Sequence, residues 1–140
     1  MAIKQLNPYL LFNGAAGKAL ELYQSALGAK VQSVTRYGDM PHNQQPPENK
    51  DRVMHAALSI GAGVLMLSDV PPGESLAPGR AFQVCLDFDD PADLQTKFDA
   101  LAHGGSVDAP VSDTFWSAKF GMLTDAFGVR WMFNCELKKA

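Results

Sequence analysis

The chain has 140 residues, 46% of them hydrophobic and 19% charged, which is typical of one globular domain that needs neither disulfides nor a structural metal. The formal net charge is −3 and no basic cluster exceeds a pair, which argues against a nucleic-acid partner. No apolar run could span a bilayer and the first residues do not resemble a secretory signal, so we expect a cytoplasmic protein without a membrane partner.

The sequence contains an internal repeat. The segments 12–31 and 88–107 align without a gap, at a spacing of 76 positions (88 − 12). They share a phenylalanine where a strand should end, a glycine where a helix should end, and a valine where the next strand should begin. The coincidence of these structural positions indicates two copies of one folding unit.

The first copy reads as strand, helix and three strands. A strand at 7–12 precedes a helix that Asn13 caps and that Gly28 ends. Spacings of three and four predict one buried helix face, made of Ala16, Ala19, Leu20, Tyr23 and Leu27. The strands that follow are predicted at 30–37, 53–60 and 64–69. The polar loop 41–51 is extra relative to the second copy, and it could either close over a ligand or be simply solvated.

The second copy follows a linker at 70–80 and repeats the pattern. Asp90 and Pro91 start its helix, Gly104 ends it, and the buried face is predicted from Leu94, Phe98, Leu101 and Ala102. The flanking strands are predicted at 82–88, 106–113, 116–124 and 129–136. We therefore expect a single α+β domain, 1–140, of two tandem βαβββ modules, at about 1–69 and 81–140, that form a curved mixed sheet and a shared pocket.

Three stretches carry a family resemblance: NPYLLFNGAAGKALELYQSALGA, VMHAALSIGAGVLMLSD and DAFGVRWMF. They resemble the PhnB-like branch of the vicinal-oxygen-chelate superfamily, which includes glyoxalase I, extradiol dioxygenases and bleomycin-resistance proteins. This branch is also labelled a 3-demethylubiquinone methyltransferase-like domain. The sequence does not favour that label, because it lacks the glycine-rich strand-to-helix turn of Rossmann-type methyltransferases.

The resemblance implies a divalent metal held by His, Glu or Gln at four strand positions. The corresponding residues here are Asn7, Gln83, Met66 (or Leu67, at an offset of one) and Met132. Neutral amides are weak ligands, and thioethers suit soft Cu(I) rather than Mg, Mn, Fe, Ni or Zn. We therefore predict no metal and no other cofactor.

Strand alternation selects candidate residues in the first copy. In 53–60 the apolar phase is taken as helix-facing, which leaves His55 and Ser59 for the pocket. His55 is the catalytic candidate, as a general base or a hydrogen-bonding group, and its alternative is a buried histidine that a neighbouring strand satisfies. Tyr9 shares a face with Asn7, where it could bind a ligand or plug the pocket.

The same reasoning selects candidates in the second copy. Trp131 and its alternate neighbours are predicted to face the helix, which leaves Arg130 and Met132 for the pocket. Arg130 could hold an anionic group. Trp116 and Phe120 are predicted to share a strand face, where they could stack on a planar ligand or belong to the core.

The two cysteines are predicted to be inert thiols. Cys85 and Cys135 fall on opposite strand faces, so no disulfide between them is expected. Neither lies in a CxxC or His/Cys motif, and no activating base is evident near Cys85.

Three functions remain open at this stage. The first is a small-molecule binding protein that works without the usual divalent metal. The second is a lyase or isomerase related to glyoxalase I that uses His55 or an atypical metal site. The third is an interaction module whose sheet edges serve dimerisation, since the resemblance also implies a homodimer. The predicted pocket residues are Asn7, Tyr9, His55, Ser59, Met66, Gln83, Trp116, Phe120, Arg130 and Met132.

Overall fold

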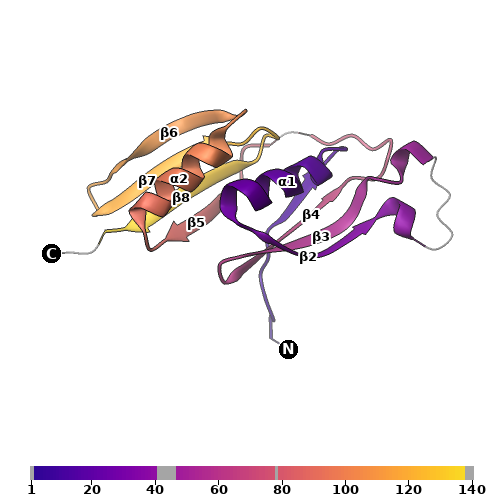
Figure 1. Ribbon diagram of the computed structural model, residues 1–140, viewed down its shortest axis with the longest axis horizontal. Helices are drawn as coiled ribbons and strands as arrows, with labels where there is room; N and C mark the ends of the chain where they lie inside the picture. Colours follow the sequence, from indigo (N-terminus) through magenta and orange to yellow (C-terminus); the bar gives the residue numbers. More distant parts are fainter. Residues whose placement is uncertain (1, 41–46, 78, 138–140) are drawn as a thin grey trace. The chain divides into compact units, whose positions relative to one another are not determined.

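The computed structural model describes residues 2–40, 47–77 and 79–137. It divides into two compact units, Met1–Ala77 and Pro78–Ala140, each with one α-helix and one four-stranded mixed sheet (Figure 1). The predicted tandem βαβββ modules are confirmed, and each module forms a sheet of its own. The extra loop predicted at 41–51 falls mostly on 41–46, which lie outside the described residues.

The first unit has the sheet order β1-β4-β3-β2, in which β1 is parallel to β4 and the other pairs are antiparallel. Its elements are β1 (Tyr9–Phe12), α1 (Ala16–Leu27), β2 (Lys30–Arg36), the 3-10 turns η1 (Tyr37–Asp39) and η2 (Pro47–Asn49), β3 (Val53–Ile60) and β4 (Gly63–Asp69).

The second unit repeats this topology with the order β5-β8-β7-β6, and β5 is parallel to β8. Its elements are β5 (Val84–Phe88), α2 (Pro91–Ala102), β6 (Ser106–Asp113), β7 (Ala118–Thr124) and β8 (Arg130–Glu136).

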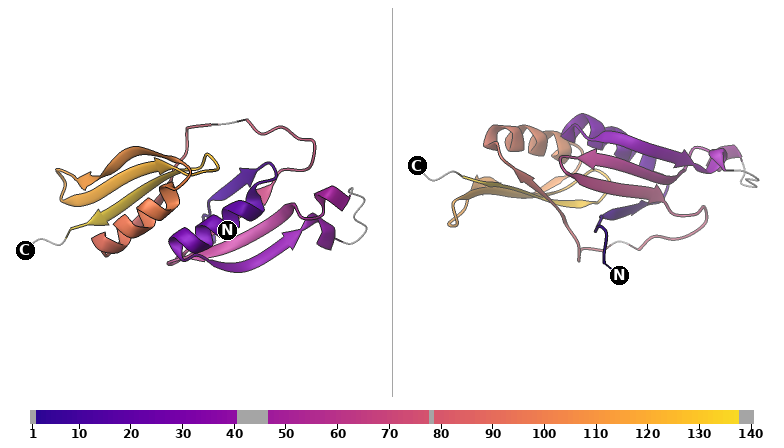
Figure 2. Two further views of the ribbon diagram at one scale, coloured as in Figure 1. Left: turned by 45° about the horizontal axis from the view of Figure 1, so that its top comes forward. Right: turned by 90° about the horizontal axis from the view of Figure 1, so that it is seen from below.

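Each helix lies across one face of its own sheet and forms a core with it (Figure 2). The predicted stripe of α1 is fully buried, and in α2 Ala102 is only half-buried while the other three residues of the stripe are buried. The predicted strand phase is also confirmed, because Trp131 and Phe133 are fully buried. The rings of Phe98 in α2 and Phe133 in β8 pack in a T-shaped arrangement, with their centroids 5.2 Å apart.

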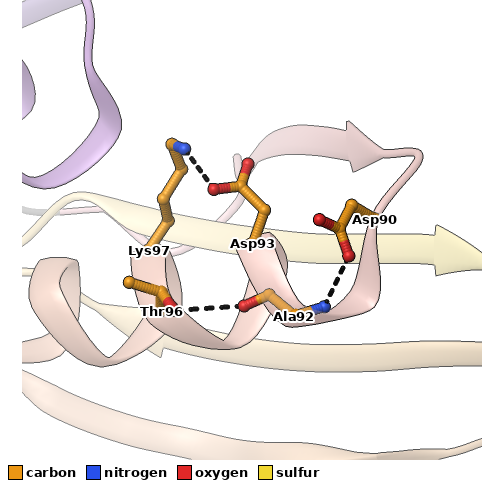
Figure 3. A network of polar contacts seen from close by, with 5 residues as sticks. All are labelled: Asp90, Ala92, Asp93, Thr96 and Lys97. Carbon is orange, nitrogen blue, oxygen red and sulfur yellow. Dashed lines mark hydrogen bonds and ion pairs between the residues drawn. The ribbon is translucent and has the colours of Figure 1, made fainter.

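The start of α2 is capped as the sequence predicts. The side chain of Asp90 accepts a hydrogen bond from the backbone N–H of Ala92 at 3.0 Å, next to the proline at N1. Figure 3 shows this cap together with the Lys97–Asp93 ion pair and the Thr96 hydroxyl, which donates to the carbonyl of Ala92. These local contacts stabilise the first two turns of the helix.

The start of α1 differs from the prediction. The N-cap residue is Ala15, without a side-chain cap, and Asn13 instead accepts a hydrogen bond from Nη2 of Arg52 at 2.9 Å. The capping acceptor is Asp69, at the end of β4, which accepts from the N–H groups of Gly14 (2.6 Å) and Ala16 (3.1 Å). The prediction was wrong because a carboxylate from a distant strand supplies the acceptor that Asn13 was expected to provide.

Asp69 also holds the start of β3. Its second carboxylate oxygen accepts from the backbone N–H of Val53 at 2.9 Å, and the residue is 2% exposed. The single carboxylate therefore satisfies three backbone donors in two segments, and two of them, the N–H groups of Ala16 and Val53, would otherwise be buried without a partner.

Replacing Asp69 with alanine should destabilise the first unit. The change removes a charge-assisted acceptor from three backbone N–H groups, so we expect a loss of about 3 kcal/mol in the free energy of unfolding. Urea denaturation followed by far-ultraviolet circular dichroism is the suitable measurement, because both tryptophans lie in the second unit. Glu21→Ala, at an exposed position of α1, is the control and should change stability by less than about 0.5 kcal/mol. Equal effects of the two substitutions would contradict the assigned role of Asp69.

Candidate functional site

The face of the first sheet opposite α1 carries most of the first unit's predicted pocket residues. We call it the helix-free face of that sheet. Tyr9 of β1 is opposite Met66 of β4, and Met66 is opposite Ala57 of β3, so these three residues form one row. His55 lies two positions before Ala57 on the same side of β3. Tyr9 and Leu11 on this face are 47% and 49% exposed.

A hydrogen bond joins two ionisable residues of this face, Tyr9 and His55. The Tyr9 hydroxyl lies 3.2 Å from Nδ1 of His55, and the ring centroids are 5.8 Å apart. When the hydroxyl donates to Nδ1, the imidazole proton is on Nε2. The histidine then offers one donor to a ligand while the tyrosine fixes its ring.

Two other predicted residues lie farther from this pair. Ser59 is four positions along β3 from His55, and its hydroxyl donates to the carbonyl of Lys30 at 3.5 Å. Asn7 precedes β1 rather than lying within it, and its side-chain oxygen accepts from Nε2 of Gln5 at 2.6 Å. The strand begins later than predicted because Pro8 has no N–H to contribute to the ladder.

The second sheet presents a comparable helix-free face, opposite α2. Cys85 of β5 is opposite Met132 of β8, which is opposite Met122 of β7. Gln83 precedes β5, in contrast to the predicted strand start at 82, and its Nε2 lies 3.8 Å from Sδ of Met122. Gln83 and Met132 are therefore grouped with a second methionine that sequence reasoning did not select.

The aromatic candidates Trp116 and Phe120 contact each other but do not share a strand. Their ring centroids are 6.1 Å apart, yet β7 begins only at Ala118. Thr114 closes a tight turn here, because its N–H donates to the carbonyl of Ala118 and its hydroxyl accepts from the N–H of that residue. The predicted strand start at 116 was wrong because this turn, with Ser117 at φ 62°, interrupts the extended chain.

A shallow cavity lies at the end of the second sheet and was not predicted. It has a volume of about 260 Å³ and is lined by Asp87, Phe88, Asn134 and Glu136. Nδ2 of Asn134 donates to Asp87 at 3.2 Å across β8 and β5. The strand alternation that placed Arg130 and Met132 on one face also places Asn134 there. The sequence therefore contained a signal for Asn134 as a residue of this face.

The two cysteines are free and lie on opposite faces, as predicted. Cys135 is buried against α2, and Cys85 is exposed on the helix-free face. Desolvation, and then the negative charge of Asp87, raise the pKa of the Cys85 thiol. A raised pKa lowers the thiolate fraction at neutral pH, which makes Cys85 a poor nucleophile.

The residues at the family's metal-binding positions do not fit a divalent metal. The first unit offers the amide of Asn7 and the thioether of Met66, and the second offers the amide of Gln83 and the thioether of Met132. Neutral amides are weak ligands for divalent cations, and thioethers suit soft metals such as Cu(I) rather than hard or borderline ones. Within residues 2–40, 47–77 and 79–137, no three His, Cys, Asp or Glu side chains form a group that could hold a metal ion.

Comparison with known proteins places this architecture in a family. Residues 5–133 match the model of the Glyoxalase/Bleomycin resistance protein/Dioxygenase superfamily. The chain belongs to this superfamily. It is 34% identical over 139 residues to Protein YjdN of Escherichia coli (strain K12), with 92% of this chain and 93% of that protein covered.

Solved structures agree with this assignment. The crystal structure of PA1353 from Pseudomonas aeruginosa is 41% identical, covers 97% of this chain and 100% of its own, and has a TM-score of 0.86. A PhnB protein from Bacillus cereus is 24% identical, with 94% and 99% coverage and a TM-score of 0.74, which shows a shared fold. In the described part of the chain, neither helix combines the length and apolarity needed to cross a membrane.

Alkylation of Cys85 should depend on Asp87. At pH 7.5 we expect iodoacetamide to modify Cys85 more slowly than a free cysteine peptide, because its raised pKa leaves less thiolate. Asp87→Asn removes the nearby negative charge, so the pKa should fall and alkylation should accelerate. The alkylation rates of wild type and Asp87→Asn should become equal when the pH rises above the Cys85 pKa of both proteins, because both thiols are then fully ionised. Mass spectrometry of the peptide that contains Cys85 gives the rate.

Asp99→Asn, on the exposed side of α2, is the matched control for this prediction. It also removes one negative charge from the second unit but should leave the rate unchanged. Equal acceleration by the two variants would show that net charge, rather than the neighbouring carboxylate, sets the reactivity.

Proposed function

We propose that this protein binds a small organic molecule through the helix-free face of its first sheet and needs no divalent metal to do so. The observation that carries the proposal is the Tyr9–His55 hydrogen bond on a face that also exposes Tyr9 and Leu11. A few directed polar groups on an otherwise apolar surface are typical of sites that bind small molecules.

The chemistry of the surrounding side chains supports binding over metal catalysis. Met66, opposite Tyr9, is an adaptable apolar group where a metal enzyme of this superfamily would need a strong ligand. Considered by itself, the second unit carries further candidate binding residues of the same kind: Gln83, Trp116, Phe120, Arg130 and Met132. Asn7 and Ser59 complete the set in the first unit.

A lyase or isomerase activity is the alternative, and one observation favours it. In the other tautomer Nδ1–H of His55 donates to the Tyr9 hydroxyl, which fixes the ring and leaves Nε2 without a proton, as a general base requires. In that case His55 would remove a proton from the bound molecule, and the same face would serve as an active site. A homodimer, which the family resemblance supports, and a cytoplasmic location, which the sequence analysis led us to expect, remain parts of the proposal.

A thermal-shift screen with metabolites, thiol adducts and drugs, carried out in the presence of EDTA, tests the binding proposal. A compound present at 100 times its dissociation constant should stabilise the protein by about 2.7 kcal/mol. His55→Ala should weaken the binding of the hits by roughly tenfold, because the ligand loses a hydrogen-bonding partner. His103→Ala, at an exposed position after α2, is the matched control and should bind as the wild type does.

Two results would contradict the proposal. The first is a screen in which compounds stabilise the protein only after a divalent metal is added. The second is a set of hits that bind His55→Ala and wild type equally. Tyr9→Phe separates the two functions, because a hit that is chemically converted by wild type and only bound by this variant would establish the enzyme alternative.

A further inference from the structure

Three sulfur-containing residues form one row on the helix-free face of the second sheet. Cys85 of β5 is opposite Met132 of β8, and Met132 is opposite Met122 of β7. The residues on either side of Met132, Trp131 and Phe133, are fully buried on the side of α2. Directly opposite residues point to the same side of a sheet, and neighbouring strands lie about 4.8 Å apart. One thiol and two thioethers are therefore neighbours across three adjacent strands.

One contact shows that the Met122 side chain extends toward β5. Its Sδ lies 3.8 Å from Nε2 of Gln83, which is two positions before Cys85 in the chain. Because β8 lies between β5 and β7, the two side chains must reach toward each other across β8 to make this contact. The Met122 sulfur is thus directed toward the strand that carries Cys85, on the side where Met132 stands.

The row is open to solvent rather than part of the core. Cys85 is exposed and forms no disulfide, and both methionines are half-buried. The other cysteine, Cys135, is buried on the opposite face of the sheet. An ion can therefore reach the three sulfur atoms without opening the packing between α2 and the sheet.

We propose that Cys85, Met122 and Met132 form a binding site for a soft monovalent metal ion, Cu(I). Thiolate and thioether sulfur are the ligands that select Cu(I) over hard cations. On binding, the Cys85 thiol releases its proton to solvent and its sulfur bonds to the metal, while each methionine sulfur donates a lone pair. Copper stays in the Cu(I) state throughout. The charges of the thiolate and the ion cancel, so the site needs no further acidic group.

This site differs from the one that the family resemblance implies. Of the four family positions it uses only Met132, and all three of its ligands come from the second unit. The prediction of no metal concerned those four positions. Cys85 was predicted to be inert because no base activates it, but a bound metal ion itself removes the thiol proton. The inference does not depend on the proposed function of the first sheet.

Anaerobic competition with bicinchoninate, which forms a coloured complex with Cu(I), tests the site. Wild type should withdraw one equivalent of Cu(I) from the competitor, and Cys85→Ser should withdraw none under the same conditions. Met122→Leu and Met132→Leu nearly conserve side-chain volume but remove the sulfur. Each should therefore bind Cu(I) roughly tenfold more weakly than wild type.

Met66→Leu and Cys135→Ala are the matched controls. The first removes a methionine from the helix-free face of the first sheet, and the second removes the buried thiol. Both variants should withdraw one equivalent with the affinity of wild type. Every variant is first compared with wild type by far-ultraviolet circular dichroism, and Met66→Leu serves alone if Cys135→Ala does not fold.

X-ray absorption at the copper edge completes the test, and it should show a first shell of three sulfur atoms in wild type. Failure of wild type to compete for Cu(I) would overturn the site. Methionine variants that bind as tightly as wild type would also overturn it, because a lone thiol would then be the ligand. So would a first shell that contains nitrogen or oxygen. Binding of Cu(I) together with a failed small-molecule screen would refute the proposed function and leave this site intact.

Discussion

The arrangement of the first unit depends on one buried carboxylate. Asp69 accepts hydrogen bonds from Gly14 and Ala16, which precede and begin α1, and from Val53, which begins β3. The segments that it fixes are those that carry the candidate site, since Tyr9 lies on the strand leading into α1 and His55 lies two residues after Val53. The second unit uses Asp125 similarly, for the backbone N–H groups of the β7–β8 turn and for the indole of Trp131. Buried acids thus hold the strand ends while the helix-free faces keep their side chains available.

Local sequence signals were sufficient for most of the fold. The 76-residue repeat predicted both βαβββ modules, because apolar periodicity and helix-ending glycines are properties of neighbouring residues. Gly28 and Gly104 both take the positive φ angles that this reasoning requires, 70° and 79°. The alternation of side chains along each strand separated the buried Trp131 from Arg130, and it placed Cys85 and Cys135 on opposite faces.

The predictions failed where distant residues compete with local ones. Asn13 has the chemistry of a helix cap, but Asp69, 55 positions away from Gly14, takes that role and leaves Asn13 to Arg52. Trp116 has a strand-like neighbourhood, but the hydrogen bonds between Thr114 and Ala118 make it part of a turn. Nη1 of Arg130 donates to the carbonyl of Arg80, 50 residues earlier, a contact that no local sequence pattern predicts. Sequence reasoning therefore selected the candidate residues but did not predict their hydrogen-bond partners, which are distant in the sequence.

Elemental analysis of untagged protein purified without chelator is the most direct test of metal-independent binding. The amide and thioether groups of Asn7, Met66, Gln83 and Met132 are poor ligands for divalent metals. We therefore predict far less than one equivalent of manganese, iron, nickel or zinc per chain. One full equivalent of any of these metals, retained through gel filtration, would contradict the account.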